Sequence, residues 1–259
     1  MTVPDTDLLF KLLFINEPLS IQVHPGDVFA RSIGLPRGKT EAWYILSASP
    51  AAKVALGLKR RLTATQLRNA IEDGSIADLV RWRHVQKDDV ILVPAGTIHA
   101  IGAGIVVVEI QQNSDATFRL FDFGRGRELH VDNALSVAHA GPAPRQAVAR
   151  RLTDARALLA ATLYFVLERI DLDPGSNWEL DAAGETWLVA LRGEASVGSM
   201  RGGPGEAFFL EDDRIILTAG ADGFSALVAY GGPEPRAGLL HSLARLPAGE
   251  LSPTVEARP

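Results

Sequence analysis

The feature that most constrains the fold is a repeated alternation of short apolar runs with glycine- and proline-rich turns. The first half contains the runs "SIQVH", "AWYIL", "KVALGL", "DVILVPAG", "IVVVEIQ" and "TFRLFDF". The second half continues with "LYFVLERIDL", "ETWLVALRGEASVG", "GEAFFL", "RIILTAG" and "FSALVAYGG". Short strands separated by turn residues at such spacing are typical of β-sandwiches and β-barrels. The sequence therefore predicts an all-β protein.

One stretch, "TATQLRNAIEDGSIADLVRW", interrupts this β pattern. Its apolar residues recur at helical spacing, and Thr63 or Thr65 is a suitable N-cap. We expect one or two short helices inserted between strands at about residues 63–83. The apolar residues at helical spacing are Leu67, Ile71, Ile76 and Leu79.

Two domains are expected because the composition changes near the middle of the chain. Residues 141–161 are rich in Pro, Ala and Arg, which predicts a connector between a first domain at 1–140 and a second β domain at 162–259. "EAWYIL" at Glu41 and "ETWLVA" at Glu185 share a Glu-x-Trp start, a short match that leaves duplication open. From Ala140 onward the only histidine is His241, so a His-based metal site is expected in the first domain alone.

The composition excludes several classes of site. Cysteine is absent, which rules out disulfides, thiolate metal sites and thiol nucleophiles. A formal net charge of −5 argues against nucleic acid as a partner. The early run "LLFKLLF" is too short for a signal-peptide core or a membrane span, so we expect no membrane partner and a cytoplasmic location. The oligomeric state stays open.

A polar pair on an otherwise apolar strand marks the first candidate site residues. Gln22 and His24 in "PLSIQVHPGD" are two apart, so their side chains share one face of the strand. Ser20 belongs to the same face, whereas Ile21 and Val23 belong to the other. A strand that served only a core would not need this pair, which indicates a binding role.

Two further residues complete a candidate metal site. Glu41 opens the strand "EAWYIL", and His99 follows a Pro-x-Gly turn in "VPAGTIH". With Gln22 and His24 they offer two imidazoles, one carboxylate and one amide oxygen, a suitable ligand set for Zn²⁺. Mn²⁺, Fe²⁺, Co²⁺ or Ni²⁺ would accept the same ligands. Each residue also has a structural interpretation, as a hydrogen-bonded histidine or a solvated strand end.

Four blocks of sequence resemble the type I phosphomannose isomerases in their shorter bacterial form. They are "PLSIQVHPGD", "GKTEAWYIL", "VPAGTIHAIGAGIVVVEIQQNSDATFRLFDFGR" and "ELHVDNAL", between Leu12 and Ala138. The second half is similar to the family's second cupin domain only in general pattern. The resemblance implies two cupin-type jelly-roll β-sandwich domains, a Zn²⁺ cofactor, and interconversion of the phosphorylated hexoses mannose 6-phosphate and fructose 6-phosphate.

The resemblance also implies roles for individual residues. Arg119 in "SDATFRLFDF" matches the arginine regarded as the active-site residue, and Lys39 and Ser20 match positions linked with the substrate phosphate or hydroxyls. The metal ligands that it implies are Gln22, His24, Glu41 and His99. An ion with a single carboxylate ligand keeps positive charge for stabilising an enediolate, which suits this set.

Glu109 is a further candidate, because it interrupts the apolar run "VVVEIQ". A buried carboxylate needs a partner, and Arg119 or Lys39 would supply one in a purely structural role. In the functional interpretation Glu109 contacts the substrate, and it is one possible general base beside a metal-bound water or another carboxylate.

Two other functions stay open at this level. Another metal-dependent cupin enzyme, such as an oxygenase or a related sugar-phosphate isomerase, would fit the His99 motif. For an oxygenase, however, Gln22 stands where a His-x-His pair is usual, and the Arg119 block is unexplained. The second alternative is a non-catalytic cupin that binds a sugar phosphate. Family members usually carry some tens of residues before the block that starts here at Pro18, so part of the substrate cleft is expected to be built differently.

Overall fold

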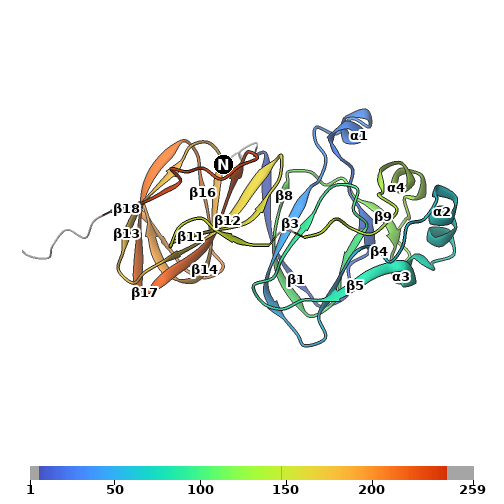
Figure 1. The fold of residues 1–259 in the computed structure, drawn as a ribbon, viewed down its shortest axis with the longest axis horizontal. Helices are drawn as coiled ribbons and strands as arrows, with labels where there is room; N and C mark the ends of the chain where they lie inside the picture. The colour runs from blue at the N-terminus through green and yellow to red at the C-terminus, as the bar shows by residue number, and fades with distance from the viewer. Residues whose placement is uncertain (1–5, 147, 244–259) are drawn as a thin grey trace, which may run out of the picture.

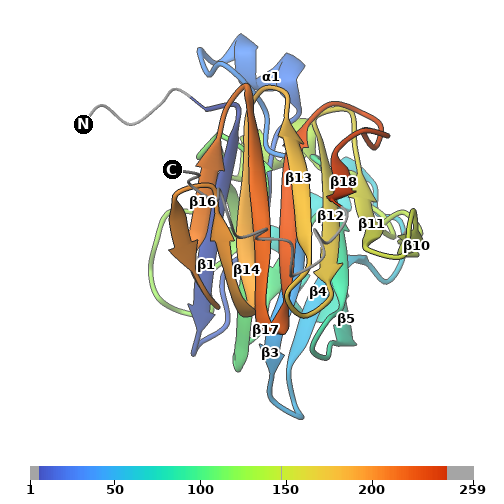
Figure 2. The same ribbon diagram turned by 90° about the vertical axis from the view of Figure 1, so that its left-hand side faces the viewer.

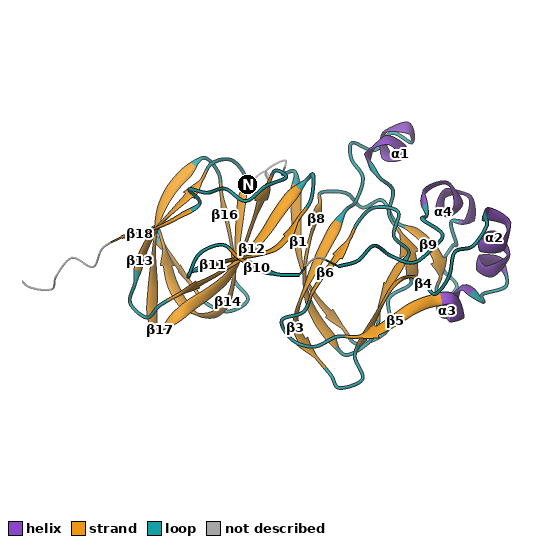
Figure 3. Ribbon diagram, in the orientation of Figure 1, coloured by secondary structure: helices purple, strands orange, loops and turns teal. Residues whose placement is uncertain are grey.

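The computed structural model describes residues 6–146 and 148–243, and over these ranges the chain forms two β domains that lie side by side (Figure 1). Antiparallel strands make up most of both domains, and the helices gather at the outer end of the first (Figure 3). The all-β, two-domain fold predicted from the sequence is confirmed. No helix in the described part of the chain has the length and hydropathy to cross a membrane.

The first domain is a sandwich of two sheets. One sheet has the strand order β1-β8-β3-β6, and the other has the order β5-β4-β7-β2-β9. Apolar side chains from both sheets, among them Trp43, Val54 and Val107, form a shared core between them. The strands are β1 (Leu8–Ile15), β2 (Ile21–Val23), β3 (Glu41–Ala48), β4 (Lys53–Leu58), β5 (Val80–His84), β6 (Val90–Val93), β7 (His99–Ile101), β8 (Ile105–Gln112) and β9 (Phe118–Phe121).

Helices cover the outer face of the second of these sheets, which explains the two-faced pattern of β2. Ile21 and Val23 pack outward in one cluster with Leu67 and Ile71, so Gln22 between them faces the interior of the sandwich. Thr63 caps α2 in a reciprocal capping box with Gln66. The expected helical insertion contains α2 and α3, and its last residues begin β5. The helices are α1 (Asp27–Ser32), α2 (Ala64–Glu72), α3 (Ile76–Leu79) and α4 (Val131–Val137).

The second domain is built from one large antiparallel sheet that folds around its own core (Figure 2). β17 pairs with β13 through its first half and with β12 through its second, so one strand serves both layers. The expected connector at 141–161 contains β10 and β11, and residues 244–259 of the expected second domain lie outside the described residues. The strands are β10 (Arg150–Arg151), β11 (Arg156–Ala161), β12 (Phe165–Leu172), β13 (Asn177–Ala182), β14 (Thr186–Val197), β15 (Met200–Gly202), β16 (Ala207–Leu210), β17 (Asp213–Gly231) and β18 (Leu240–Leu243).

An apolar layer joins the two domains, and we call it the seam. It contains Ala42, Tyr44 and Val108 from the first domain and Leu167 and Leu227 from the second. Because side chains alternate along a strand, β3 presents Ala42, Tyr44 and Leu46 to the seam and Glu41, Trp43 and Ile45 to the interior of the first domain. The first part of β3, from Glu41 to Ile45, is therefore buried on both faces.

A polar contact at the edge of the seam also ties the domains together. The Glu185 carboxylate, directly before β14, accepts hydrogen bonds from the backbone N–H groups of Asp7 and Leu8 at 2.7 and 3.0 Å. It also accepts one from the indole of Trp187 at 2.8 Å. One side chain of the second domain thus fixes the start of the first strand of the first domain.

Candidate metal centre

The candidate site lies between the two sheets of the first domain. Arg119 on β9 pairs with Gln22 on β2, and Gln22 pairs with His99 on β7, so these three residues form one row across a sheet. Directly opposite residues on neighbouring strands point to the same face. Glu41 comes from β3 in the facing sheet, which brings its carboxylate toward this row.

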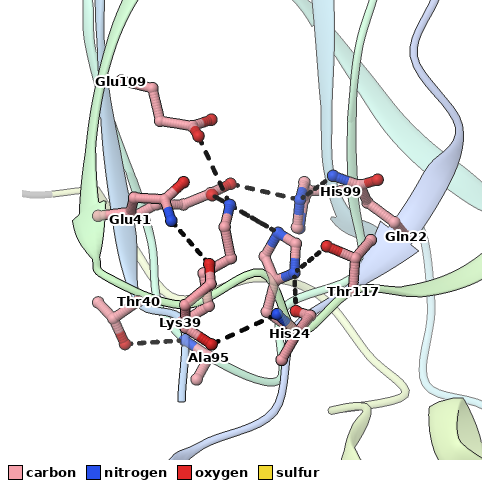
Figure 4. A network of polar contacts seen from close by, with 12 residues as sticks. Gln22, His24, Lys39, Thr40, Glu41, Ala95, His99, Glu109 and Thr117 are labelled. Atoms are coloured by element: carbon pink, nitrogen blue, oxygen red, sulfur yellow. Dashed lines mark hydrogen bonds and ion pairs between the residues drawn. The ribbon is translucent and has the colours of Figure 1, made fainter. Parts of the chain in front are cut away.

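Two histidines point their Nε2 atoms at the carboxylate of Glu41 (Figure 4). The distances are 3.5 Å from His24 Nε2 and 3.4 Å from His99 Nε2 to the two carboxylate oxygens. Each ring is held from behind, because His24 Nδ1 lies 2.8 Å from the Ala116 carbonyl and His99 Nδ1 lies 2.8 Å from the Thr97 carbonyl. Nδ1–H therefore donates to a carbonyl, and the lone pair of each Nε2 faces the cluster.

Gln22 borders this cluster with support from Ser20. The amide Nε2 of Gln22 is 3.3 Å from His99 Nε2, and its Oε1 accepts a hydrogen bond from Ser20 Oγ at 3.1 Å. Amide oxygen and nitrogen occupy equivalent positions when the terminal group turns by a half rotation. That rotation would direct the oxygen of Gln22 toward the histidines. Ser20 is buried and contacts Gln22, which makes it a support of the site.

Lys39 and Glu109 extend the cluster, as Figure 4 shows. The Lys39 ammonium forms an ion pair with Glu41 and lies 3.3 Å from His24 Nε2 and 3.5 Å from Glu109 Oε1. Glu109 on β8 pairs in register with Trp43 on β3 and with Lys11 on β1. Lys39 and Glu109 are only 5% and 6% exposed, so their charges interact within the protein and away from bulk water.

The charge of this cluster keeps Glu41 ionised. Burial by itself would raise the pKa of Glu41, but the charge of the nearby Lys39 ammonium outweighs burial and holds that pKa well below its usual range. Burial lowers the pKa of His99 to about 3 and also lowers that of His24. Both imidazoles are therefore neutral, which is the form in which histidine binds a metal.

Glu109 differs from Glu41 although the two carboxylates share the same surroundings. Burial and the negative charge of Glu41 raise the pKa of Glu109 to about 7, against the opposing effect of Lys39. The ion pair of Lys39 with Glu41 is closer than its contact with Glu109, so less of its charge is available to Glu109. A carboxyl group with a pKa near 7 is suited to exchanging protons at neutral pH.

The donor atoms present fit a divalent transition metal. His24, Glu41 and His99 each offer one ligand atom, and these atoms lie within 4.8 Å of one another. Zn²⁺ binds imidazole nitrogen and carboxylate oxygen in this way. The carbonyl behind each ring supplies the outer hydrogen bond that fixes the orientation of a metal-binding histidine. Gln22 is placed to complete the set.

Arg119 lies at the half-buried margin of the row. Its Nη1 donates to the Glu128 carbonyl at 2.8 Å, and its Nε is 3.9 Å from the Asp122 carboxylate. The buried Nε has no hydrogen-bond partner among the described residues. The backbone of Arg119 is fixed as well, since its N–H donates to His130 Nδ1 at 3.0 Å. The backbone of Arg119 is therefore held in place, while its guanidinium keeps N–H donors that are free to bind a ligand.

Sequence reasoning missed several groups that hold the site. Trp43 donates its indole N–H to Glu41 Oε1 at 3.2 Å, and Thr117 Oγ1 is 3.4 Å from His24 Nδ1. The Trp43 contact had a signal in the sequence, because residues 41 and 43 share a face of the strand. The carbonyl groups of Thr97 and Ala116 had none, since any residue type provides a carbonyl.

Comparisons with known proteins place this geometry in context. No family model matches the chain. It is 39% identical to a mannose-6-phosphate isomerase from Streptococcus mutans over 140 residues, which are 52% of this chain and 44% of that protein. It is also 39% identical to the mannose-6-phosphate isomerase ManA from Bacillus subtilis over 146 residues, 54% of this chain and 46% of that protein. The chain thus spans under half the length of these curated relatives.

Solved structures of mannose 6-phosphate isomerases resemble the fold of this chain. The mannose 6-phosphate isomerase structure from Bacillus subtilis superimposes with a TM-score of 0.75 and 28% identity, covering 86% of this chain and 74% of that chain. A variant of the phosphomannose isomerase from Salmonella typhimurium superimposes with a TM-score of 0.70 and 15% identity, covering 87% and 78% of the two chains. The two domains of this protein therefore have the cupin fold of these enzymes.

Proposed function

We propose that the chain is a phosphomannose isomerase, as its resemblance to these enzymes suggests, and that it interconverts mannose 6-phosphate and fructose 6-phosphate in a metal-dependent reaction. The observation that carries the proposal is the buried cluster of His24, Glu41 and His99, in which two neutral imidazoles converge on one ionised carboxylate. A phosphorylated hexose substrate also agrees with the cytoplasmic location expected from the sequence.

We propose Zn²⁺ as the metal, with Gln22, His24, Glu41 and His99 as its ligands. A divalent ion held by these groups would polarise a carbonyl oxygen and stabilise negative charge on it. Glu41 holds a charge of opposite sign to both the ion and Lys39, and its low pKa keeps it available at neutral pH. The imidazoles and the amide bring no charge, so the set would leave an ion with a net charge of about +1 toward the substrate.

Aldose–ketose isomerisation moves a proton between two neighbouring carbons, and we propose that Glu109 handles this proton. Its pKa of about 7 allows it to accept and return a proton near neutral pH. The Lys39 ammonium, 3.5 Å from Glu109, would stabilise the ionised form before the proton arrives. Since Lys39 is engaged with two carboxylates, its expected contact with the substrate phosphate stays a prediction.

Arg119 is proposed to bind the substrate at the margin of the row. Its guanidinium is permanently charged and offers planar donors that suit a sugar oxygen or a phosphate. The row places it two strands from His99, roughly 10 Å at the usual spacing of neighbouring strands. A phosphorylated hexose can span this distance when its carbonyl end lies at the metal cluster.

A coupled assay that detects fructose 6-phosphate formed from mannose 6-phosphate tests the proposal. We expect turnover with added Zn²⁺ and its loss after chelation, with recovery on adding metal again. His99→Ala should lose both bound metal and turnover, because an imidazole ligand is removed. His84→Ala, at an exposed histidine of β5, serves as the control and should behave as the wild type.

The outcomes separate the proposal from its alternatives. Binding of hexose phosphate without turnover in the metal-loaded protein would reveal a sugar-phosphate-binding module. Oxygen uptake dependent on iron or manganese would reveal an oxygenase. Turnover that survives complete removal of metal would contradict the metal-dependent mechanism.

A further inference from the structure

A cavity of about 380 Å³ opens at the end of the seam, away from the metal centre. Its first-domain wall includes Tyr44 and Asp88, and its second-domain wall includes Arg169, Arg192 and Ser225. A site built from both domains has a shape that depends on how the domains pack.

The face of the second domain changes from apolar to polar at this cavity. Leu167 on β12 and Leu227 on β17 pack in the apolar seam. Two residues along the same strands, and so on the same face, lie Arg169 and Ser225. Polar groups thus replace apolar ones where the seam meets the cavity.

A β-bulge brings a second arginine to this position. β14 pairs Ala190 with Ala226 of β17 and then Arg192 with Ser225, which leaves one extra residue in β14. Bulges bend a strand and redirect its side chains, and they recur beside binding sites. Ser225 consequently has Arg192 on one neighbouring strand and Asp171 on the other.

The buried hydroxyl of Ser225 has no structural role that the fold explains. It is 2% exposed and lines the cavity, yet its hydroxyl has no hydrogen-bond partner among the described residues. A buried hydroxyl without a partner is unfavourable, and such groups are rare in native proteins. A ligand that accepts a hydrogen bond would provide the missing partner.

The charges around the cavity favour an anion. Lys87 and Arg192 line it, and neither side chain forms an ion pair or hydrogen bond within residues 6–146 and 148–243. Arg169 bonds Asp171 at 2.9 and 3.2 Å, and Asp88 accepts a hydrogen bond from Tyr44. Both carboxylates are therefore engaged, whereas two of the three cations are free.

We propose that this cavity is a second binding site, specific for a phosphate group, at the junction of the two domains. Lys87, Arg192 and the Ser225 hydroxyl bind the oxygens, with further donors from Arg169. Guanidinium and ammonium groups form strong, charge-assisted hydrogen bonds with phosphate. The group can be inorganic phosphate or the phosphate of a hexose phosphate, since the chemistry that recognises it is the same.

Isothermal titration with inorganic phosphate at fixed ionic strength tests the site. We expect saturable binding of phosphate to the wild type. The double variant Lys87→Gln/Arg192→Gln should bind phosphate about tenfold more weakly or worse, because charged contacts with the anion are lost. Arg81→Gln/Arg150→Gln removes the same charge from exposed positions outside the cavity and should leave the affinity unchanged. Arg119→Ala should also retain binding, which distinguishes this site from the metal centre.

Ser225→Ala gives an independent measurement by thermal unfolding. Without phosphate the variant should melt at or above the wild-type Tm, because an unpaired buried hydroxyl is removed. With phosphate it should gain less stability than the wild type.

A titration of mannose 6-phosphate into Arg119→Ala distinguishes inorganic phosphate from a hexose phosphate as the ligand. If mannose 6-phosphate binds with the same affinity as inorganic phosphate, the site recognises the phosphate group alone. If it binds more tightly, the sugar contributes to binding. Absence of binding by either compound, or equal binding by the Lys87→Gln/Arg192→Gln variant, would overturn the proposal.

Discussion

At the scale of single residues, the ammonium group of Lys39 gives two neighbouring carboxylates different pKa values. Glu41 and Glu109 are both buried, and burial raises the pKa of a carboxyl group. Lys39 forms its closest ion pair with Glu41, whose pKa falls, while the pKa of Glu109 rises to about 7. The site thereby holds one fixed charge and one exchangeable proton.

Glu109→Gln tests this assignment through the pH dependence of stability. The folded-state pKa is raised, so Glu109 contributes stability that is present below its unfolded pKa and lost as the pH rises through about 7. We expect the free energy of unfolding to fall across this window less in Glu109→Gln than in the wild type, measured by urea titration at several pH values. Turnover should also drop by about 10²-fold or more if Glu109 transfers the proton.

The control for this measurement is Glu211→Gln, at an exposed glutamate, which should follow the wild-type pH profile. An unchanged slope in Glu109→Gln would show that Glu109 titrates at its ordinary value. If Glu109→Gln loses the pH dependence of stability but keeps full activity, the raised pKa of Glu109 would be supported and its role in proton transfer would be contradicted.

Arg119→Ala is expected to separate substrate handling from metal binding. The side chain contacts Glu128 and Asp122 and none of the proposed ligands, so bound metal should stay at the wild-type level. Removing a positioned donor should lower turnover by about 10²- to 10³-fold. Metal analysis and steady-state kinetics on the same sample give both quantities. Loss of metal together with activity would assign Arg119 to the metal site instead.

The residue types of the candidate site could be predicted, but their connections could not. Gln22, His24 and His99 were identifiable because polar residues on apolar strands are unusual. The position of Lys39 among the donor atoms depends on how the two sheets face each other, which spacing along the chain does not define. The same holds for Ser225, whose significance depends on a bulge in a distant strand.

At the scale of elements, the helices explain why β2 can present polar residues inward. Leu67 and Ile71 of α2 belong to the same apolar cluster as the outer side chains Ile21 and Val23, so the strand is held by its apolar face. The short helices α1 and α4 were not predicted, because six- and seven-residue segments give little periodicity.

β11 is an element whose type the sequence did not predict. Its sequence "RALLAA" consists of good helix formers, yet it forms a strand. Leu159 and Ala160 enter the seam, and Arg156 forms a buried bidentate pair with Glu168 of β12 at 2.8 Å. Tertiary packing and this ion pair outweigh local propensity, so the Pro-, Ala- and Arg-rich composition alone could not distinguish a strand from a connector.

Ile71→Ala is predicted to destabilise the first domain by about 2–4 kcal/mol, the usual cost of truncating a buried isoleucine. Because Ile71 supports β2 from outside, metal affinity should fall as well. Chemical denaturation and metal titration measure the two effects. Thr65→Ala, on the exposed side of α2, should change neither. Normal metal affinity in a destabilised Ile71→Ala protein would show that α2 supports the fold and not the site.

At the scale of the whole molecule, the repeated Glu-x-Trp motif has two different uses. In both domains the tryptophan indole donates to the glutamate two residues earlier. Glu41 directs its carboxylate into the metal cluster, whereas Glu185 binds the backbone of Asp7 and Leu8 across the seam. The echo noted in the sequence thus corresponds to a shared local structure, while the cross-domain contact was not predictable from it.

Glu185→Ala should loosen this junction. Two backbone donors lose their acceptor, and we expect a loss of about 1–3 kcal/mol in the free energy of unfolding. Hydrogen exchange at the amides of Asp7 and Leu8 should accelerate. Glu194→Ala, which removes an exposed ion pair with Arg201, is the control and should have little effect. Unchanged exchange at Leu8 would mean that Glu185 does not hold the strand.

The part of β3 that is buried on both faces has a consequence for engineering this protein. Glu41 and Tyr44 are three residues apart on one strand but project to opposite sides, one toward the metal cluster and one toward the second domain. Substitutions on the second domain can therefore shift the ligand geometry without replacing a ligand. Libraries that aim to alter the proposed isomerase activity should therefore include these remote positions.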